Sequence, residues 1–341
     1  MEAGFRFIWW QFSCIFVIVL GILLSMVSSS WFGMWMGMEV SFCASIPLLN
    51  SSYKVMTKVG FAESVLKYFL VQSVGSMMVI MGTVCVYLGD FLGSLYYWYI
   101  YLVLGGLFLK LGVFPFYMWV PSVMGGLSWG GCFLVGCVQK IIPIFWLIDV
   151  FYIYEGDLIG MSMFLGVITT LVGGLGGLSQ VLMRGILAYS SISHIGWVCC
   201  IMSYDVSGGL LYFLLYFFIG GGLFMLLGHY DVNSCLYLNL SEEKMPGFFV
   251  LVVSVSLFSL GGLPPFTGFV GKLLGIFSLH SQVLGLSLML VSSVMSLSYY
   301  LGFVLVMVIS GSFSKGRRWF YWGGYSWFKI LVLVMNCLGP M

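Results

Sequence analysis

Eleven apolar runs, bounded by polar residues, glycine or proline, take up most of this chain. A helix needs about 20 apolar residues to cross the ~30 Å hydrocarbon core of a bilayer. Only 7% of the residues are charged, against roughly 25% in soluble domains. A water-soluble globule is therefore excluded, and we predict an all-α integral membrane protein with 11 transmembrane helices. The runs cover residues 7–27, 31–50, 60–88, 95–125, 127–150, 158–178, 185–203, 207–229, 247–278, 282–310 and 319–338.

The basic residues of the predicted loops all fall on one side of the membrane. With 11 spans, the side that holds the N-terminus has eight Lys and Arg residues, and the opposite side has none. Loop charge of this kind sets membrane orientation, so we place the N-terminus on the basic side and the C-terminus opposite. The basic set is Arg6, Lys54, Lys58, Arg184, Lys244, Lys315, Arg317 and Arg318, and the opposite loops hold Asp90, Asp149, Glu155, Asp157 and Asp205.

Two runs, 95–125 and 247–278, are longer than a bilayer needs and carry Gly and Pro in their middles. In each, a proline stands three residues after a glycine that follows leucine: Gly112 and Pro115 in the first, Gly261 and Pro264 in the second. Proline removes a backbone donor and disfavours helix at the preceding residue. Each span is therefore predicted to divide into two half-helices.

The two broken spans occupy the fourth position in spans one to five and in spans six to ten. Interrupted spans in corresponding positions indicate a transporter built from two related halves. An odd number of spans per half makes the repeats inverted. We predict one five-helix repeat in residues 1–156, a second in 157–310, and a C-terminal helix in 311–341. The alternative is that the prolines merely kink two unrelated helices.

Four charged residues lie inside predicted spans: Glu39, Lys110, Lys140 and Lys272. Each costs about 2.5–3.5 kcal/mol at that depth on insertion scales. Burial disfavours the charged form of a lysine and a nearby carboxylate favours it, so such a lysine can exchange its proton when a partner moves. These residues are candidates for a proton relay. A purely structural ion pair is the alternative, although Glu39 can neutralise at most one or two of the three lysines.

His194 lies in the middle of the seventh span, with Ser190 and Ser191 on the same helical face. It is a further candidate for the relay, and a structural role is equally open. Glu63 and Lys67, spaced i and i+4 near the end of the third span, predict an ordinary helix ion pair.

The residues that hold electron carriers are scarce in this sequence. The histidines His194, His229 and His280 stand on three segments. Eight of the nine cysteines lie in apolar runs, and the sequence has no CxxC motif. The glycine run at 173–177 predicts close helix packing instead of a phosphate loop. We therefore expect no redox centre, metal site or bound cofactor in this chain. A net charge of +2 with scattered basic residues implies no nucleic-acid partner.

Six stretches of the sequence form a recognisable series. They are WMGME at 35–39, KYFLVQ at 67–72, KLGVFPFYMWVP at 110–121, QKIIP at 139–143, LAYSSISHIGW at 187–197 and LGGLPPFTGF at 260–269. These stretches resemble the chain 2 family of NADH:ubiquinone oxidoreductase, respiratory complex I. The resemblance runs in order from about residue 31 to residue 272, and beyond the ninth span it rests on hydropathy.

The resemblance implies an antiporter-like, proton-pumping membrane subunit of a mitochondrial inner-membrane enzyme. It implies that NADH, FMN, iron–sulfur clusters and ubiquinone belong to other parts of the complex, and that the partners are lipid and other membrane-arm and accessory subunits. The family's proton-path residues fall on Glu39, Lys110, Lys140 and Lys272. The basic side would be the matrix, and the C-terminus would face the intermembrane space.

Three positions depart from the family pattern. Arg184 is followed by Gly185 instead of a second basic residue. Tyr117 stands where the family usually has histidine, and its phenol is a poorer proton carrier near neutral pH. Gly271 precedes Lys272 where proline is common. The functions that remain open beside proton pumping within a complex are those of a stand-alone cation/proton antiporter and of a structural membrane spacer.

Overall fold

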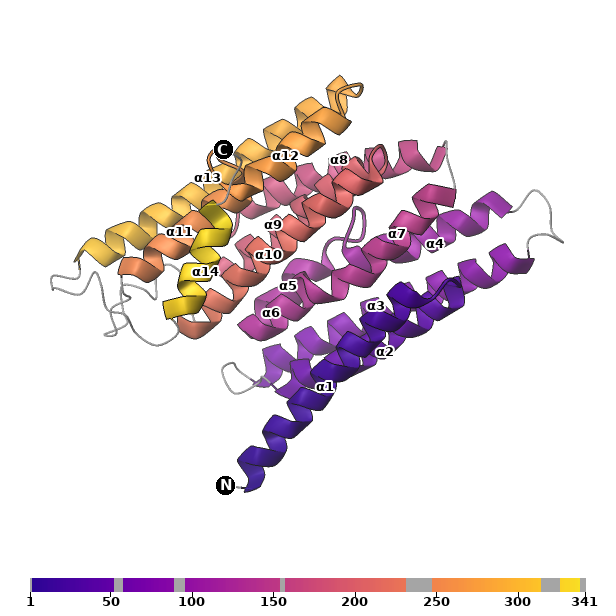
Figure 1. Cartoon of the computed structure of the whole chain (residues 1–341), viewed down its shortest axis with the longest axis horizontal. Helices are drawn as coiled ribbons and strands as arrows, with labels where there is room; N and C mark the ends of the chain where they lie inside the picture. The colour runs from indigo at the N-terminus through magenta and orange to yellow at the C-terminus, as the bar shows by residue number, and fades with distance from the viewer. Residues whose placement is uncertain are drawn as a thin grey trace. The chain divides into compact units, whose positions relative to one another are not determined.

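The computed structural model describes residues 2–51, 58–88, 96–153, 157–230, 247–313 and 326–337, which form α-helices and one short 3-10 helix (Figure 1). The chain divides into two compact units, Met1–Leu158 and Ile159–Met341. The all-helical prediction is confirmed for these residues.

The first unit contains seven of the described α-helices and the 3-10 helix η4. They are α1 (Glu2–Val27), α2 (Trp31–Ser51), α3 (Lys58–Leu88), α4 (Tyr96–Leu111), α5 (Trp119–Gly126), α6 (Trp129–Gly136), η4 (Val138–Lys140) and α7 (Ile141–Ile153). Helix α1 packs along α2, and α3 packs along α4.

The second unit begins within the first turn of α8. Its helices are α8 (Asp157–Leu178), α9 (Met183–Met202), α10 (Val206–Tyr230), α11 (Gly247–Gly261), α12 (Thr267–Ser278), α13 (Val283–Phe313) and α14 (Ser326–Cys337). Helix α10 packs against α9 and α12, while α11 packs against α13 and α14.

Eight helical segments among the described residues are long and apolar enough to cross a membrane, and three further apolar helices are shorter. The predicted number of 11 spans stays a prediction. The eight segments are Trp9–Val27, Trp31–Asn50, Gly60–Leu88, Trp129–Ile153, Leu158–Leu178, Met183–Met202, Val206–Gly228 and Val283–Val308. Several charged loop residues lie outside the described residues: Lys54, Asp90, Glu155, Lys244, Lys315, Arg317 and Arg318.

The predicted break in the first long span is confirmed, because α4 ends at Leu111 and α5 begins at Trp119. Helix α4 ends in a Schellman motif: the amide of Val113 donates to the carbonyl of Phe108 at 2.9 Å, and Gly112 has a φ of +78°. This left-handed conformation costs other residues about 1–2 kcal/mol. Glycine therefore ends the helix before the proline is reached.

The second predicted break is confirmed between α11 and α12, and its hydrogen bonds repeat those of the first. Gly262 has a φ of +74°, its amide donates to Ser259 at 3.0 Å, and the amide of Leu263 donates to Phe258 at 3.2 Å. The register differs from the sequence expectation by one residue. Gly262 corresponds to Gly112, so Pro265 and not Pro264 corresponds to Pro115, and both Pro115 and Pro265 follow cis peptide bonds.

A third break was not predicted. The run expected as one span at 127–150 is interrupted at Cys137 and continues through η4 into α7. Pro143 explains the restart, since it lies in the first turn of α7, where no intrahelical donor is required. In contrast, Pro47 lies inside α2 without ending that helix.

Glycines allow close contact between helices in both units. A Cβ added to Gly21 of α1 would lie 2.7 Å from the carbonyl oxygen of Gly37 in α2. A Cβ added to Gly173 of α8 would lie 2.7 Å from the backbone nitrogen of Ser193 in α9. The glycine run at 173–177 therefore serves helix packing, as the sequence predicts.

Candidate functional site

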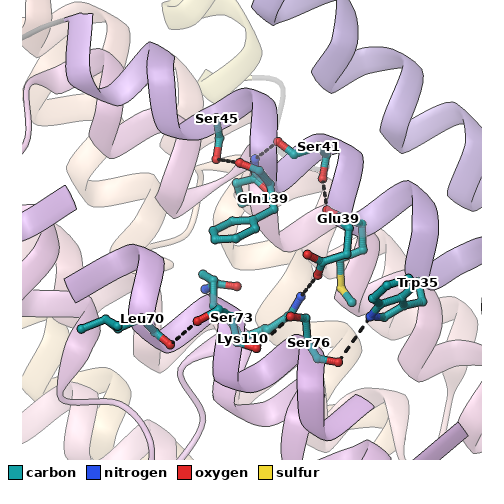
Figure 2. A network of polar contacts seen from close by, with 12 residues as sticks. Trp35, Glu39, Ser41, Ser45, Leu70, Ser73, Ser76, Lys110 and Gln139 are labelled. Atoms are coloured by element: carbon teal, nitrogen blue, oxygen red, sulfur yellow. Dashed lines mark hydrogen bonds and ion pairs between the residues drawn. The ribbon is translucent and has the colours of Figure 1, made fainter. Parts of the chain in front are cut away.

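In the first unit, Lys110 and Glu39 form an ion pair at the end of α4 (Figure 2). The distance between Lys110 Nζ and Glu39 Oε1 is 3.3 Å, and the side chains are 2% and 23% exposed. The sequence predicted both residues as candidates without assigning them a distance. Removing either partner would leave the other charge unpaired in an apolar surrounding, so each residue is needed to stabilise the charge of the other.

Neighbouring donors hold the backbone around Lys110. The indole N–H of Trp119 donates to the carbonyl of Leu109 at 3.0 Å, and the Gln72 amide donates to the carbonyl of Lys110 at 3.4 Å. The Gln72 bond serves a carbonyl in the last turn of α4, where helical donors run out. The Trp119 bond gives the Leu109 carbonyl a second donor beside the amide of Gly112, which is 3.3 Å away. A Cβ added to Gly75 would lie 2.8 Å from Lys110 Cγ, so this glycine makes room for the lysine stem.

Lys140 is the last residue of η4 and is 2% exposed. The preceding residue, Gln139, donates from its side chain to the carbonyl of Ser41 at 3.2 Å (Figure 2). Ser41 lies two residues after Glu39 on α2. The turn that carries Lys140 is therefore attached to α2 within one helical turn of the carboxylate.

In the second unit, Lys272 lies on α12 and is 7% exposed. Its ammonium donates to the carbonyl of Gly261, the last residue of α11. Among the described residues, no carboxylate forms an ion pair with it. The carboxyl end of a helix carries partial negative charge, so the end of α11 supplies the counter-charge. A Cβ added to Gly262 would lie 2.6 Å from Lys272 Cδ.

His194 lies in α9 and is 7% exposed. Its Nδ1 is 2.9 Å from the hydroxyl of Tyr212 in α10. The ring of Tyr216 stacks on the imidazole, with centroids 5.0 Å apart. The hydroxyls of Ser190 and Ser191, expected to accompany His194, donate to backbone carbonyls of their own helix.

The other sequence expectations concern residues outside these contacts. Glu63 and Lys67 form the predicted i,i+4 pair at 2.6 Å, with side chains 61% and 47% exposed, so it is an ordinary surface pair. Tyr117 is part-buried and stacks with Phe114, with ring centroids 6.3 Å apart.

Sequence reasoning missed the residues that position the charged groups. Gln72, Gln139 and Tyr212 were not candidates, because glutamine and tyrosine in an apolar run have no spacing that indicates a partner. Gln72 and Gln139 stand within the family-like stretches KYFLVQ and QKIIP, which is the only signal that the sequence offered for them. Tyr212 had none.

The described arrangement is that of an antiporter-type membrane subunit: interrupted helices, with buried lysines at their breaks and a carboxylate beside one of them. The chain belongs to the NADH:quinone oxidoreductase/Mrp antiporter transmembrane family, whose model matches residues 28–298.

Curated relatives make the comparison more specific. The chain is 33% identical over 296 residues to NADH-ubiquinone oxidoreductase chain 2 of Suncus etruscus, with 83% of this chain and 81% of the relative covered. It is 33% identical over 291 residues to the protein of the same name from Anopheles gambiae, with 84% and 82% covered.

Solved structures share the fold. A chain of respiratory complex I from Thermus thermophilus has a TM-score of 0.79 at 24% identity, with 96% of this chain and 76% of that chain covered. A chain of the Mrp complex from Dietzia sp. DQ12-45-1b has a TM-score of 0.76 at 20% identity. That match covers 85% of this chain and 59% of the Mrp chain, so this chain spans less than two thirds of it.

Proposed function

We propose that this chain translocates protons as a membrane-arm subunit of NADH:ubiquinone oxidoreductase in the mitochondrial inner membrane. Its relatives carry the name of that enzyme's chain 2. The observation that carries the proposal is the Lys110–Glu39 pair, an ion pair whose lysine is buried at the end of an interrupted helix. An interrupted helix at membrane depth is tolerated only where protein or a wet cavity covers its backbone.

Each buried group has a distinct role in the proposal. Glu39 tunes Lys110 electrostatically, Lys140 is the central exchange site, and Lys272 passes the proton toward the acidic side. His194 takes part in the relay. A lysine between apolar burial and a movable counter-charge changes its proton affinity when that counter-charge moves, which is the event that a pump requires.

The energy comes from redox chemistry in other subunits. NADH, FMN, the iron–sulfur clusters and ubiquinone are bound elsewhere in the complex in this proposal, and this chain holds none of them. Its partners are lipid and the other membrane-arm and accessory subunits. The multi-subunit assemblies named for the fold relatives are the support for such partners.

We further propose 11 spans arranged as two inverted five-helix repeats, residues 1–156 and 157–310, with a C-terminal helix in 311–341. The shared hydrogen-bond pattern at the two breaks supports the repeat. The charge distribution of the loops supports an N-terminus in the matrix and a C-terminus in the intermembrane space.

Replacing Lys140 tests the function. In the assembled complex, Lys140→Met is expected to lower the number of protons pumped per NADH oxidised, because the exchange site is gone while the apolar volume is kept. Lys67→Met, which removes a lysine from the exposed surface pair, is the matched control and should leave the ratio unchanged. An unchanged ratio in an assembled Lys140→Met complex would contradict the proposal and favour a structural spacer.

A second preparation, the chain purified alone, separates pumping within a complex from independent exchange. The purified chain in liposomes is expected to carry no cation/proton exchange, since its driving force lies in other subunits. Exchange by the isolated chain would show a stand-alone antiporter instead.

A further inference from the structure

Tyr212 on α10 contacts the helices that carry two of the proposed proton-exchanging groups. Its hydroxyl is 2.9 Å from His194 Nδ1 on α9. Its ring lies against Gly271 on α12, where an added Cβ would be 2.8 Å from Tyr212 Cδ2. The next residue along α12 is Lys272. Tyr212 is 3% exposed, so its position is determined by these neighbours.

A second aromatic ring packs against Tyr212. Trp197 on α9 stacks on Tyr212 with centroids 6.3 Å apart and an angle of 14° between the planes. A Cβ added to Gly275, one turn after Gly271, would lie 2.8 Å from Trp197 Cζ3. Two glycines on one face of α12 thus receive two stacked rings, one from α10 and one from α9.

The hydrogen bond to Nδ1 limits what the imidazole can do. In a neutral histidine one ring nitrogen is a donor and the other an acceptor, and the partner of one nitrogen sets the role of the other. A phenol serves in either direction. The ring of Tyr216, with its centroid 5.0 Å away, stacks on the imidazole and restrains its plane. The Tyr212 hydroxyl then selects, of the two orientations related by a flip about the Cβ–Cγ bond, the one that points Nδ1 at it.

We propose that Tyr212 is the positioning residue that orients His194 and that couples its imidazole to the segment of α12 carrying Lys272, through the contact of its ring with Gly271. This proposal rests on the proposed proton-pumping function. A displacement of α12 at Lys272 displaces the Tyr212 ring, since Gly271 leaves no space between ring and backbone. The ring carries the hydroxyl, so the bond to His194 changes with it.

Tyr212→Phe tests the proposal in the assembled complex, because it keeps the ring and removes the hydroxyl. The pumping rate is expected to fall by about two- to tenfold, the change that loss of one net hydrogen bond implies. The pH profile of the pumping rate should change as well. A purely structural loss would instead lower that rate by the same factor at every pH. Tyr204→Phe, which removes the hydroxyl of an exposed tyrosine in the same unit, is the control and should leave the pumping rate and its pH profile unchanged.

Gly271→Ala tests the contact with α12. The new methyl is expected to push the Tyr212 ring away from His194 and to reproduce the altered pH profile. Gly302→Ala on α13, where an added Cβ meets nothing within 4 Å, is the control. If Gly271 acts through the hydroxyl, the double variant Gly271→Ala/Tyr212→Phe is no more impaired than the worse single variant. Fully additive losses would refute the coupling. Should Tyr212→Phe fail to assemble, Gly271→Ala carries the test alone.

His194→Gln, measured in parallel, separates this proposal from the proposed function. A normal ratio in His194→Gln removes His194 from the relay and overturns both statements about it. A lowered ratio in His194→Gln with a normal rate and pH profile in Tyr212→Phe overturns the positioning role of Tyr212 alone.

Discussion

The two helix breaks use the same backbone geometry and hold their lysines in opposite ways. At the first break, Lys110 stands before the glycine and pairs with the Glu39 carboxylate. The carbonyl of the preceding residue there is satisfied by the neutral indole of Trp119. At the second break, Lys272 stands after the glycine, and its own ammonium satisfies the last carbonyl of α11. A buried lysine beside a Schellman ending can therefore be neutralised either by a carboxylate from another helix or by the carbonyl dipoles of the ending itself.

The largest effect is expected from removing the carboxylate of the first break. Glu39→Ala leaves the Lys110 ammonium buried without its carboxylate partner, and breaking such a pair costs about 3–5 kcal/mol. Peptide-resolved alkylation of the buried Cys132 measures opening of the first unit, and that of Cys200 measures opening of the second. Cys132 should react faster in the variant and Cys200 should not.

Two further variants test whether loss of the charge pair is what opens the first unit in Glu39→Ala. Glu63→Ala removes a carboxylate from an exposed pair and should leave both cysteines unchanged. Glu39→Ala/Lys110→Met removes both charges and should recover most of the lost protection. A double variant as reactive as Glu39→Ala would mean that charge pairing does not explain the stability of the first break.

The next effect comes from the neutral donor of the first break. Trp119→Phe removes the 3.0 Å bond to the Leu109 carbonyl, which keeps the 3.3 Å bond from the Gly112 amide, so the cost is about 0.5–1.5 kcal/mol. Hydrogen exchange at the last turn of α4 should increase. Trp146→Phe is the control with the same loss of volume, since its indole N–H has no partner among the described residues. Equal effects of the two variants would show that packing, and not the bond, closes α4.

Replacing the positive-φ glycine of each break by alanine separates two effects, the strain of the backbone and the displacement of a neighbouring lysine. Gly112→Ala and Gly262→Ala each place a side chain at positive φ, which costs about 1–2 kcal/mol. Only Gly262→Ala meets a lysine stem, at 2.6 Å from Lys272 Cδ. Both should lower thermal stability similarly, and Gly262→Ala should lower the proton-to-electron ratio more. Equal ratios would contradict the distinct environment of Lys272.

The smallest effect is expected at Asp205 of the second unit, a charged residue that also lies at the end of a helix, directly before α10. The Ser207 hydroxyl, 2.7 Å away, and then the backbone N–H of Gly208 lower the pKa of this carboxyl below its ordinary value. A carboxylate at the amino end of a helix, here α10, contributes about 0.3–1 kcal/mol.

The pH dependence of that contribution follows from the direction of the shift. Because the folded pKa lies below the unfolded one, the stabilisation is present above the unfolded pKa and is lost as the pH falls through the folded pKa. Asp205→Asn should therefore reduce amide protection in the first turn of α10 near neutral pH, and match the unchanged chain at a pH below the folded pKa. A difference that persists at acid pH would contradict a charge effect.

Several elements could be predicted because their causes are local in the chain. Glycine followed by proline interrupts a helix wherever it stands, so the breaks after α4 and α11 were expected. The break at Cys137 was missed, because the proline that requires it lies six residues later, after helix has resumed. The one-residue register difference at Gly262 arose because Gly261 and Gly262 are adjacent, and only the backbone hydrogen bonds select one of them.

Apolar length and the insertion cost of charge belong to the sequence alone, and they determined a multi-span membrane chain with Glu39, Lys110, Lys140, Lys272 and His194 as its exceptional residues. Tertiary structure decided what each of these residues contacts. Lys110 has a carboxylate 71 residues away in the chain, Lys272 has a helix end, and His194 has a phenol. Such partners come from segments that helix packing brings together. That packing depends on contacts between glycines and aromatic rings, and no local sequence pattern shows which glycine meets which ring.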